Sequence, residues 1–115
     1  MKKKNVINQN YLENIPVRNA KIGWNTDEGG IVTLLVENKG IANKIAQRLF
    51  KKPKISYIHL DEMGSFVWPA IDGEKNIIKI AKEVKEHFGD SAEPLYERLA
   101  KYFEILRSYG FVNFK

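Results

Sequence analysis

The chain has 115 residues, a formal net charge of +5 and a hydrophobic content of 43%, which suits one globular domain. It contains no cysteine, so disulfides, thiolate-ligated metals and thiol nucleophiles are excluded. No uninterrupted apolar run approaches the roughly 18 residues of a membrane-spanning helix, and we expect a cytoplasmic protein.

The chain begins with a polar stretch, in which three lysines follow Met1 and are succeeded mainly by asparagine, glutamine and glutamate. No apolar run follows the lysines, so a solvated basic tail is favoured over a signal peptide. We expect residues 1–13 to be a flexible N-terminal segment. Residues 14–115 are then expected to form a single domain.

Extended segments come next. Pro16 disfavours helix in the residue before it, so residues 14–18 are predicted to be extended. A first strand over 20–24, a turn at Asp27–Gly30 and a β-branched strand over 31–36 predict a hairpin. Residues 55–60 alternate partly between polar and apolar side chains and are predicted to form the third strand.

A basic amphipathic helix is predicted over residues 41–51, between the second and third strands. Residues 39–54 contain no acid, and their six basic residues are Lys39, Lys44, Arg48, Lys51, Lys52 and Lys54. Three interpretations of this helix remain open: a solvated face, a surface for an acidic partner, or membrane-surface association. Membrane association ranks last because the apolar stripe is narrow.

Three helices are predicted after the third strand. Asp61 is expected to cap a helix that runs through residue 71, with an early end or a kink at Pro69. Asn76 is expected to cap a second helix, which ends at Gly89. Ser91 is expected to cap the last helix, which Gly110 ends. The order predicts an α+β fold, a small antiparallel sheet followed by a trihelical unit resembling helix-turn-helix architecture.

No catalytic constellation is present in the sequence. His59 and His87 lie on different predicted elements without metal-ligand spacing. The serines stand beside no candidate base and orienting group. We therefore expect no enzymatic activity, no metal and no cofactor.

A family resemblance rests on an ordered set of short motifs. The central ones are Leu60–Trp68, with its Asp-Glu-Met-Gly-Ser-Phe-Val core, and the turn Ile71-Asp72-Gly73. Residues 76–81, Phe88-Gly89 and Gly110-Phe111 follow in the expected order, and Pro16, Arg18 and Trp24 precede them. Over roughly residues 14–112 the chain resembles the PqqD-like family, and it departs from the simplest members by the insertion at 40–54.

The resemblance implies a winged-helix-like module known as a RiPP recognition element, where RiPPs are ribosomally made and post-translationally modified peptides. Such a module is non-catalytic. It binds a precursor's leader peptide as an added strand beside its third strand and against its last helix. It then presents the peptide to a modifying enzyme, often a radical-SAM enzyme.

The expected peptide-binding residues lie on two elements. An unpaired strand edge offers backbone groups to an extended peptide, and a helix with a broad apolar stripe can face both core and groove. The strand residues are Ile55, Ser56, Tyr57, Ile58, His59 and Leu60. The helix residues are Leu95, Tyr96, Leu99, Tyr102, Phe103 and Leu106.

The alternative function is a winged-helix nucleic-acid-binding or regulatory protein. Helix 76–88 mixes Lys79, Lys82 and Lys85 with Glu83 and Glu86. Because phosphate repels such acids, this mixture argues against nucleic acid as a partner. The exposed edge strand permits either a monomer or a homodimer.

Overall fold

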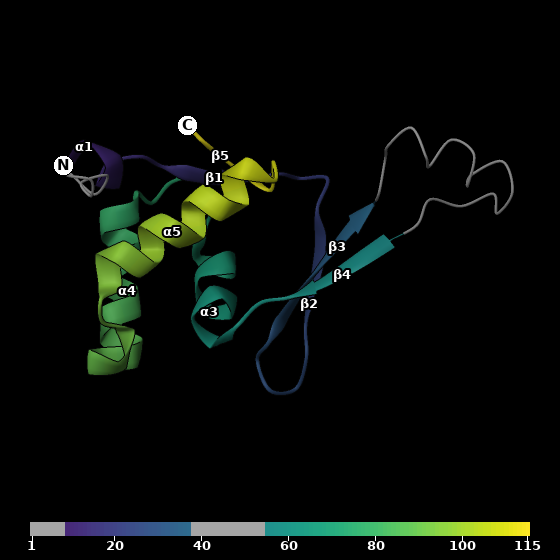
Figure 1. Ribbon diagram of the computed structural model, residues 1–115, viewed down its shortest axis with the longest axis horizontal. Coiled ribbons are helices and arrows are strands. Elements are labelled where there is room, and N and C mark those ends of the chain that lie inside the picture. Colours follow the sequence, from purple (N-terminus) through teal and green to yellow (C-terminus); the bar gives the residue numbers. More distant parts are fainter. Residues whose placement is uncertain (1–8, 38–54) are drawn as a thin grey trace, which may run out of the picture.

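The computed structural model describes residues 9–37 and 55–115. A three-stranded antiparallel sheet has the order β2-β3-β4, and three helices follow it along the chain (Figure 1). The strands are β2 (Gly23–Thr26), β3 (Val32–Glu37) and β4 (Ile55–His59), and the helices are α3 (Glu62–Ala70), α4 (Ile77–Phe88) and α5 (Leu95–Ser108). This confirms the predicted α+β order; the inserted helix over 41–51 lies outside the described residues.

The β2–β3 hairpin turns at Asp27–Gly30, as predicted, and only its first strand begins later than expected. The Oδ1 atom of Asp27 accepts hydrogen bonds from the N–H groups of Gly29 and Ile31, at 2.8 and 3.0 Å. Gly30 has a φ of 86°, which favours glycine. The strand predicted over 20–24 was misplaced, because the N–H of Ile22 bonds to the carbonyl of Asn19 in a turn before β2 begins.

Two helix starts match the predicted caps. The Asp61 carboxylate accepts from the N–H of Gly64 at 2.7 Å and begins α3. The Asn76 side chain accepts from the N–H of Lys79 at 2.9 Å and begins α4. Both side chains satisfy donors that the first helical turn leaves without intrahelical partners.

The predicted start of the last helix was wrong. A 3₁₀ turn, η2 (Gly89–Ala92), follows α4, and α5 begins only after Pro94. The Ser91 hydroxyl donates to the carbonyl of Phe88 at 2.7 Å, so it binds the end of the preceding helix and caps nothing. At the other end, Gly110 has a φ of 78° and ends α5 as expected.

A second, two-stranded sheet joins the two ends of the described chain. Strand β1 (Pro16–Arg18) pairs antiparallel with β5 (Val112–Phe114). Before it, the short helix α1 (Gln9–Leu12) places Leu12 in the core at 8% exposure. Residues 9–12, within the segment 1–13 that we expected to be flexible, form this helix.

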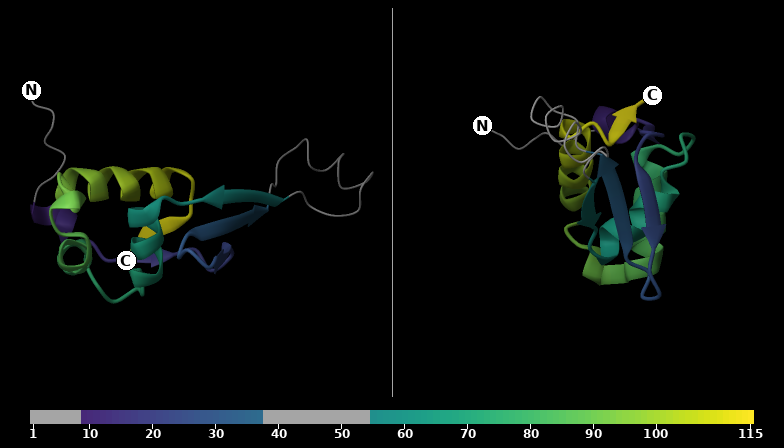
Figure 2. Two further views of the ribbon diagram at one scale, coloured as in Figure 1. Left: turned by 90° about the horizontal axis from the view of Figure 1, so that it is seen from below. Right: turned by 90° about the vertical axis from the view of Figure 1, so that its right-hand side faces the viewer.

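The core lies between the three helices and the inner face of the sheet. The fully buried side chains with the largest volumes include Trp68 of α3, Phe103 of α5 and Leu34 of β3. Figure 2 shows the strands extending away from the helices. One edge of the sheet, β4, therefore leads directly from the projecting sheet into α3.

Candidate functional site

Strand β4 has an open edge. It pairs with β3 on one side, and no described strand pairs with it on the other. The N–H of Leu60 donates to the carbonyl of Val32 at 2.9 Å, so this N–H points toward β3. Because backbone groups alternate along an antiparallel strand, Ser56 and Ile58 also face β3, whereas Ile55, Tyr57 and His59 face the open edge.

The side chains of β4 lie on two different faces. Ile58 and Leu60 pack against the core. Tyr57 lies on the outer face and is 64% exposed. The imidazole Nδ1 of His59, on that same outer face, is 2.7 Å from the hydroxyl of Thr33 on β3. A strand added at this edge would therefore meet an apolar inner face and a more polar outer one.

A cavity of about 250 Å³ opens where β4 leads into α3. Helix α5 forms one wall with Arg98, Lys101, Tyr102 and Ile105, and the start of α3 forms the other with Asp61, Met63 and Gly64. Ile105 is 46% exposed. We call the cavity together with the edge of β4 the β4–α5 groove.

Tyr102 of α5 forms a hydrogen bond to α3 and so connects the two walls of the cavity. Its hydroxyl donates to the carbonyl of Gly64 at 3.0 Å. Burial raises the pKa of Tyr102 above its ordinary value, and the negative charge of Asp61 raises it further. The phenol is therefore neutral at physiological pH and can keep donating this bond.

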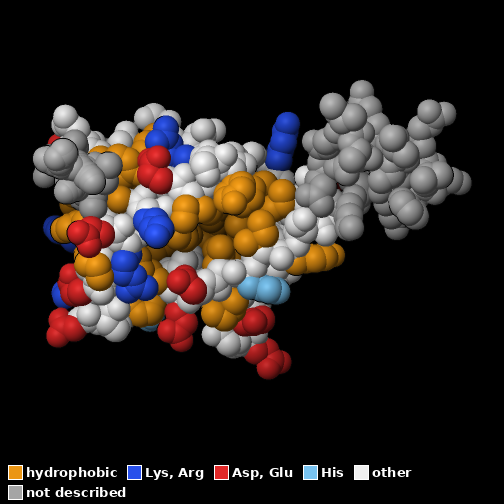
Figure 3. Space-filling model, viewed as in Figure 1, with side chains coloured by type: hydrophobic (Ala, Val, Ile, Leu, Met, Phe, Trp, Pro, Cys, Tyr) orange, Lys and Arg blue, Asp and Glu red, His pale blue; other side chains and the backbone are white. Residues whose placement is uncertain are grey.

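Side chains in the groove combine apolar surface with charge of both signs. Lys101 is exposed. Arg98 donates through Nη1 to the carbonyl of Ser91 at 2.9 Å, which holds its guanidinium beside the cavity. Figure 3 shows a hydrophobic area between the C-terminal half of α5 and the strands, with basic and acidic side chains around it. Such a surface suits an extended segment with apolar and acidic residues.

The structure places the twelve expected site residues in different environments. All six strand residues lie on or immediately after β4. On the helix, only Tyr102 lines the groove. Tyr96 precedes Ile105 by nine residues, which is about two and a half helical turns, so it lies on the opposite face of α5. The four remaining helix residues are buried in the core: Leu95, Leu99, Phe103 and Leu106.

Sequence reasoning missed the groove residues Arg98, Lys101 and Ile105. Their spacing of three and four residues places them on one helical face beside Tyr102. The available signal was a polar stripe beside an aromatic residue. The predicted residues were instead taken from the apolar stripe, which forms the core.

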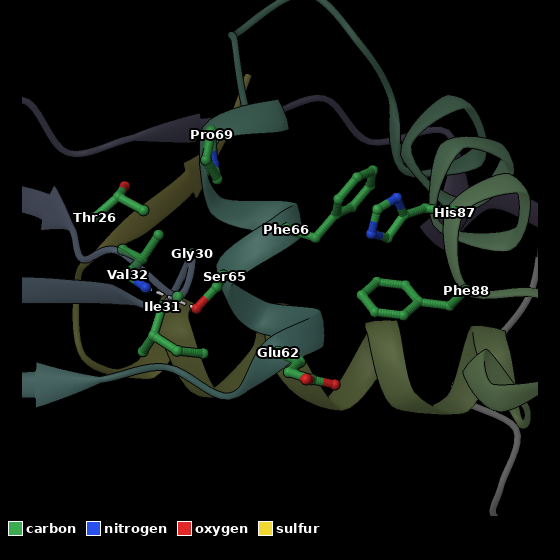
Figure 4. Close-up of a pocket in the computed structure, with 11 residues that line it drawn as sticks. Thr26, Gly30, Ile31, Val32, Glu62, Ser65, Phe66, Pro69, His87 and Phe88 are labelled. Carbon is green, nitrogen blue, oxygen red and sulfur yellow. Dashed lines mark hydrogen bonds between the residues drawn. The ribbon is translucent and has the colours of Figure 1, made fainter.

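A second cavity, of about 530 Å³, lies on the other side of α3. Figure 4 shows Phe66 of α3 facing His87 at the end of α4, with Phe88 below them. The Phe66 and His87 rings stack with centroids 4.5 Å apart. The Ser65 hydroxyl accepts from the N–H of Val32 at 2.8 Å, which ties α3 to β3 at the cavity wall.

The described residues bring together no group of three or more His, Asp or Glu side chains that could hold a metal ion. Within ranges 9–37 and 55–115, no helix is both long enough and apolar enough to cross a bilayer.

Comparison with known proteins assigns a family. Searches of curated proteins and of solved structures returned no match. The family model described as Coenzyme PQQ synthesis protein D (PqqD) matches residues 47–112, which is more than half of the chain. The matched range contains β4, the three helices and both walls of the groove. The chain therefore belongs to the PqqD family of non-catalytic binding proteins.

Proposed function

We propose that this protein captures the leader of a ribosomally made precursor peptide in the β4–α5 groove and presents it to a modifying enzyme of the radical-SAM class. Membership of the PqqD family supports the binding role. The observation that carries the proposal is the open edge of β4, which ends at the cavity between α3 and α5. Residues 14–115 would act as one winged-helix-like peptide-binding domain.

The leader would pair with β4 through backbone groups. The N–H and C=O groups of Ile55, Tyr57 and His59 point outward and would continue the ladder into a fourth strand, antiparallel or parallel. Backbone pairing accepts many sequences, so it supplies affinity and little selectivity. The register of the leader would instead depend on the side chains that enter the cavity.

Side-chain selection would come from α5. A leader residue on the inner face would meet Tyr102 and Ile105 and would be favoured if it were apolar. A neighbouring acidic residue would meet Lys101 at the rim, where an exposed ion pair is worth about 0.2–1 kcal/mol. The preferred leader segment is therefore extended, with an apolar anchor flanked by an acid.

The charge distribution disfavours the alternative of nucleic-acid binding. Of the chain's 19 lysines and arginines, nine lie in residues 1–8 and 38–54, whereas all 14 aspartates and glutamates lie in the described ranges. The described part therefore carries more acids than bases. A nucleic-acid-binding domain is expected to show the opposite balance on its recognition elements.

The test is a titration of the ¹⁵N-labelled protein with the synthetic leader of a candidate precursor peptide. Backbone amides of Ile55, Tyr57 and His59 should shift and become protected from hydrogen exchange. Amides of α4 should change little. If the shifts cluster on α4 and spare β4, the binding mode is wrong.

A further inference from the structure

Two buried nitrogen donors without acceptors lie near β2, which is the outer strand of the three-stranded sheet on the side away from β4. They are Nη1 of Arg18 and the indole Nε1 of Trp68, and neither has a hydrogen-bond partner among the described residues. Trp68 is fully buried, at 0% exposure. An unsatisfied buried donor costs free energy, and a charged one costs more. Two such donors beside one cavity therefore call for an acceptor.

The Arg18 guanidinium lies beside the rings of both tryptophans. The guanidinium carbon of Arg18 is 5.9 Å from the centroid of the Trp68 ring and 5.1 Å from that of Trp24. A guanidinium that stacks on aromatic rings keeps its N–H groups in its own plane, free to meet an acceptor edge-on. All three residues line a cavity of about 230 Å³.

The surrounding backbone is held in place. Arg18 is in β1, opposite Val112 of β5. The next residue, Asn19, bonds through its backbone N–H to the carbonyl of Phe111 at 2.9 Å and through its side chain to the carbonyl of Gly110 at 2.9 Å. Backbone and side-chain hydrogen bonds therefore hold Arg18 and Asn19 against the segment that leads into β5, and this fixes the backbone from which the guanidinium extends.

No carboxylate side chain of this chain serves as the acceptor. All 14 aspartates and glutamates lie in the described ranges, and none forms an ion pair with Arg18. Residues 1–8 and 38–54 contain no aspartate or glutamate. A carboxylate on another molecule could satisfy both donors.

We propose that Arg18 and Trp68 form a carboxylate-binding site for a second polypeptide. One carboxylate oxygen accepts from the guanidinium and the other from the indole N–H, because an ionised carboxylate has acceptor sites on both oxygens. Trp24, on edge strand β2 and 38% exposed, forms a further wall of the cavity.

This site is separate from the β4–α5 groove. β2 and β4 are the two outer strands of the sheet, with β3 between them. A polypeptide bound here would leave the edge of β4 open. The proposal goes beyond leader capture and does not depend on it, since it rests only on the two donors and their cavity.

The experiment uses the indole N–H signals of the full-length ¹⁵N-labelled protein. The chain has two tryptophans, and Trp24→Phe identifies the signal of Trp68. The carboxylate probes are N-acetylglycine, for a chain terminus, and an acetylated, amidated Gly-Glu-Gly peptide, for an acidic side chain. The controls are N-acetylglycinamide and sodium chloride at matched ionic strength.

Both carboxylate probes should move the Trp68 indole signal downfield and saturably at millimolar concentrations, and the controls should not. A response to only one probe also supports the site and identifies the source of the carboxylate. Arg18→Lys, which keeps the charge but loses the planar fork, should weaken binding about tenfold. If the Trp68 signal of the unaltered protein ignores both carboxylates, or follows chloride equally, the proposal is overturned.

Discussion

The hydroxyl of Tyr102 donates a 3.0 Å hydrogen bond to the carbonyl of Gly64 and so joins α5 to the first turn of α3. The contact is possible because residue 64 lacks a side chain. The same two residues form part of the cavity beside β4. The separation of the groove walls therefore depends on this contact.

Gly64→Ala should destabilise the protein and distort the groove. A Cβ atom at residue 64 would lie 3.0 Å from Oδ1 of Asp61 and 3.0 Å from Cε1 of Tyr102. Alanine favours helix over glycine by about 1 kcal/mol, but overpacking costs roughly 1–3 kcal/mol, so a net loss is expected. Urea denaturation measures the loss.

Gly23→Ala is the matched control. Its Cβ would have ordinary contacts of 3.6 Å with Leu35. It should leave the free energy of unfolding within about 0.5 kcal/mol of the parent. Equal destabilisation by both substitutions would show that the close contact at Gly64 is unimportant.

Stability should fall at alkaline pH through Tyr102. Its pKa is raised in the folded state by burial, so the fold favours the neutral phenol. This contribution is fully present below the unfolded pKa of about 10 and is lost as the pH rises above it, by up to about 1.4 kcal/mol per pH unit. Tyr11, whose pKa is raised by burial and by its hydrogen bond to Glu104, adds in the same direction.

Tyr102→Phe separates the two tyrosines. It should cost about 0.5–1.5 kcal/mol at pH 7 through the lost hydrogen bond. Between pH 10 and 12, the decline in its stability should be shallower than that of the parent. Urea midpoints measured across this range check the prediction, and parallel curves for the two proteins would contradict it.

Local signals in the sequence predicted much of the fold. Asp61 and Asn76 were identified as caps because each precedes a helical apolar pattern, and such bonds span only three residues. The pairing of β1 with β5 joins residues about a hundred positions apart, and no local pattern encodes it. Ser91 failed as a cap because Pro94 delays α5, and nothing nearby distinguishes that serine from a true cap.

The lining of the proposed groove was anticipated only in part, for a similar reason. Residues 55–60 were identified because the partial alternation of polar and apolar side chains within the segment itself indicates a strand. The residues of the last helix that face the groove are set by the rotation of that helix about its axis relative to α3. The apolar stripe in the sequence identifies only the side of the helix that is buried. Leu99 and Phe103 were consequently chosen, although both are at 0% exposure. The groove residues Lys101 and Ile105 lie beside that stripe.

Tyr57→Pro should weaken leader binding and leave the fold intact. The N–H of Tyr57 points away from β3, so proline removes a donor of the open edge and no donor of the existing ladder. Loss of one backbone bond and the bulk of the ring should reduce affinity about tenfold or more. Isothermal titration calorimetry measures the affinity, and circular dichroism checks the fold.

Two further variants distinguish the backbone effect from other causes. Tyr57→Ala keeps the N–H and should retain most of the affinity. Ile58→Pro removes a donor that faces β3 and should unfold the sheet. If Tyr57→Pro binds the leader as tightly as Tyr57→Ala does, the leader does not pair with the edge at this residue.

Ile105→Glu against Tyr96→Glu tests which face of α5 meets the leader. The two residues are 46% and 45% exposed, so the substitutions should each change the free energy of unfolding by no more than about 0.5 kcal/mol. Ile105 lines the cavity, whereas Tyr96 is on the opposite face of the helix. A glutamate at position 105 would place charge where an apolar leader side chain docks and would lower affinity by about tenfold or more. Because both variants add the same negative charge to the same helix, long-range electrostatics cannot account for a difference between them. Equal affinities for the leader would exclude α5 as the second wall, and a loss confined to Tyr96→Glu would place the leader on the other side of the helix.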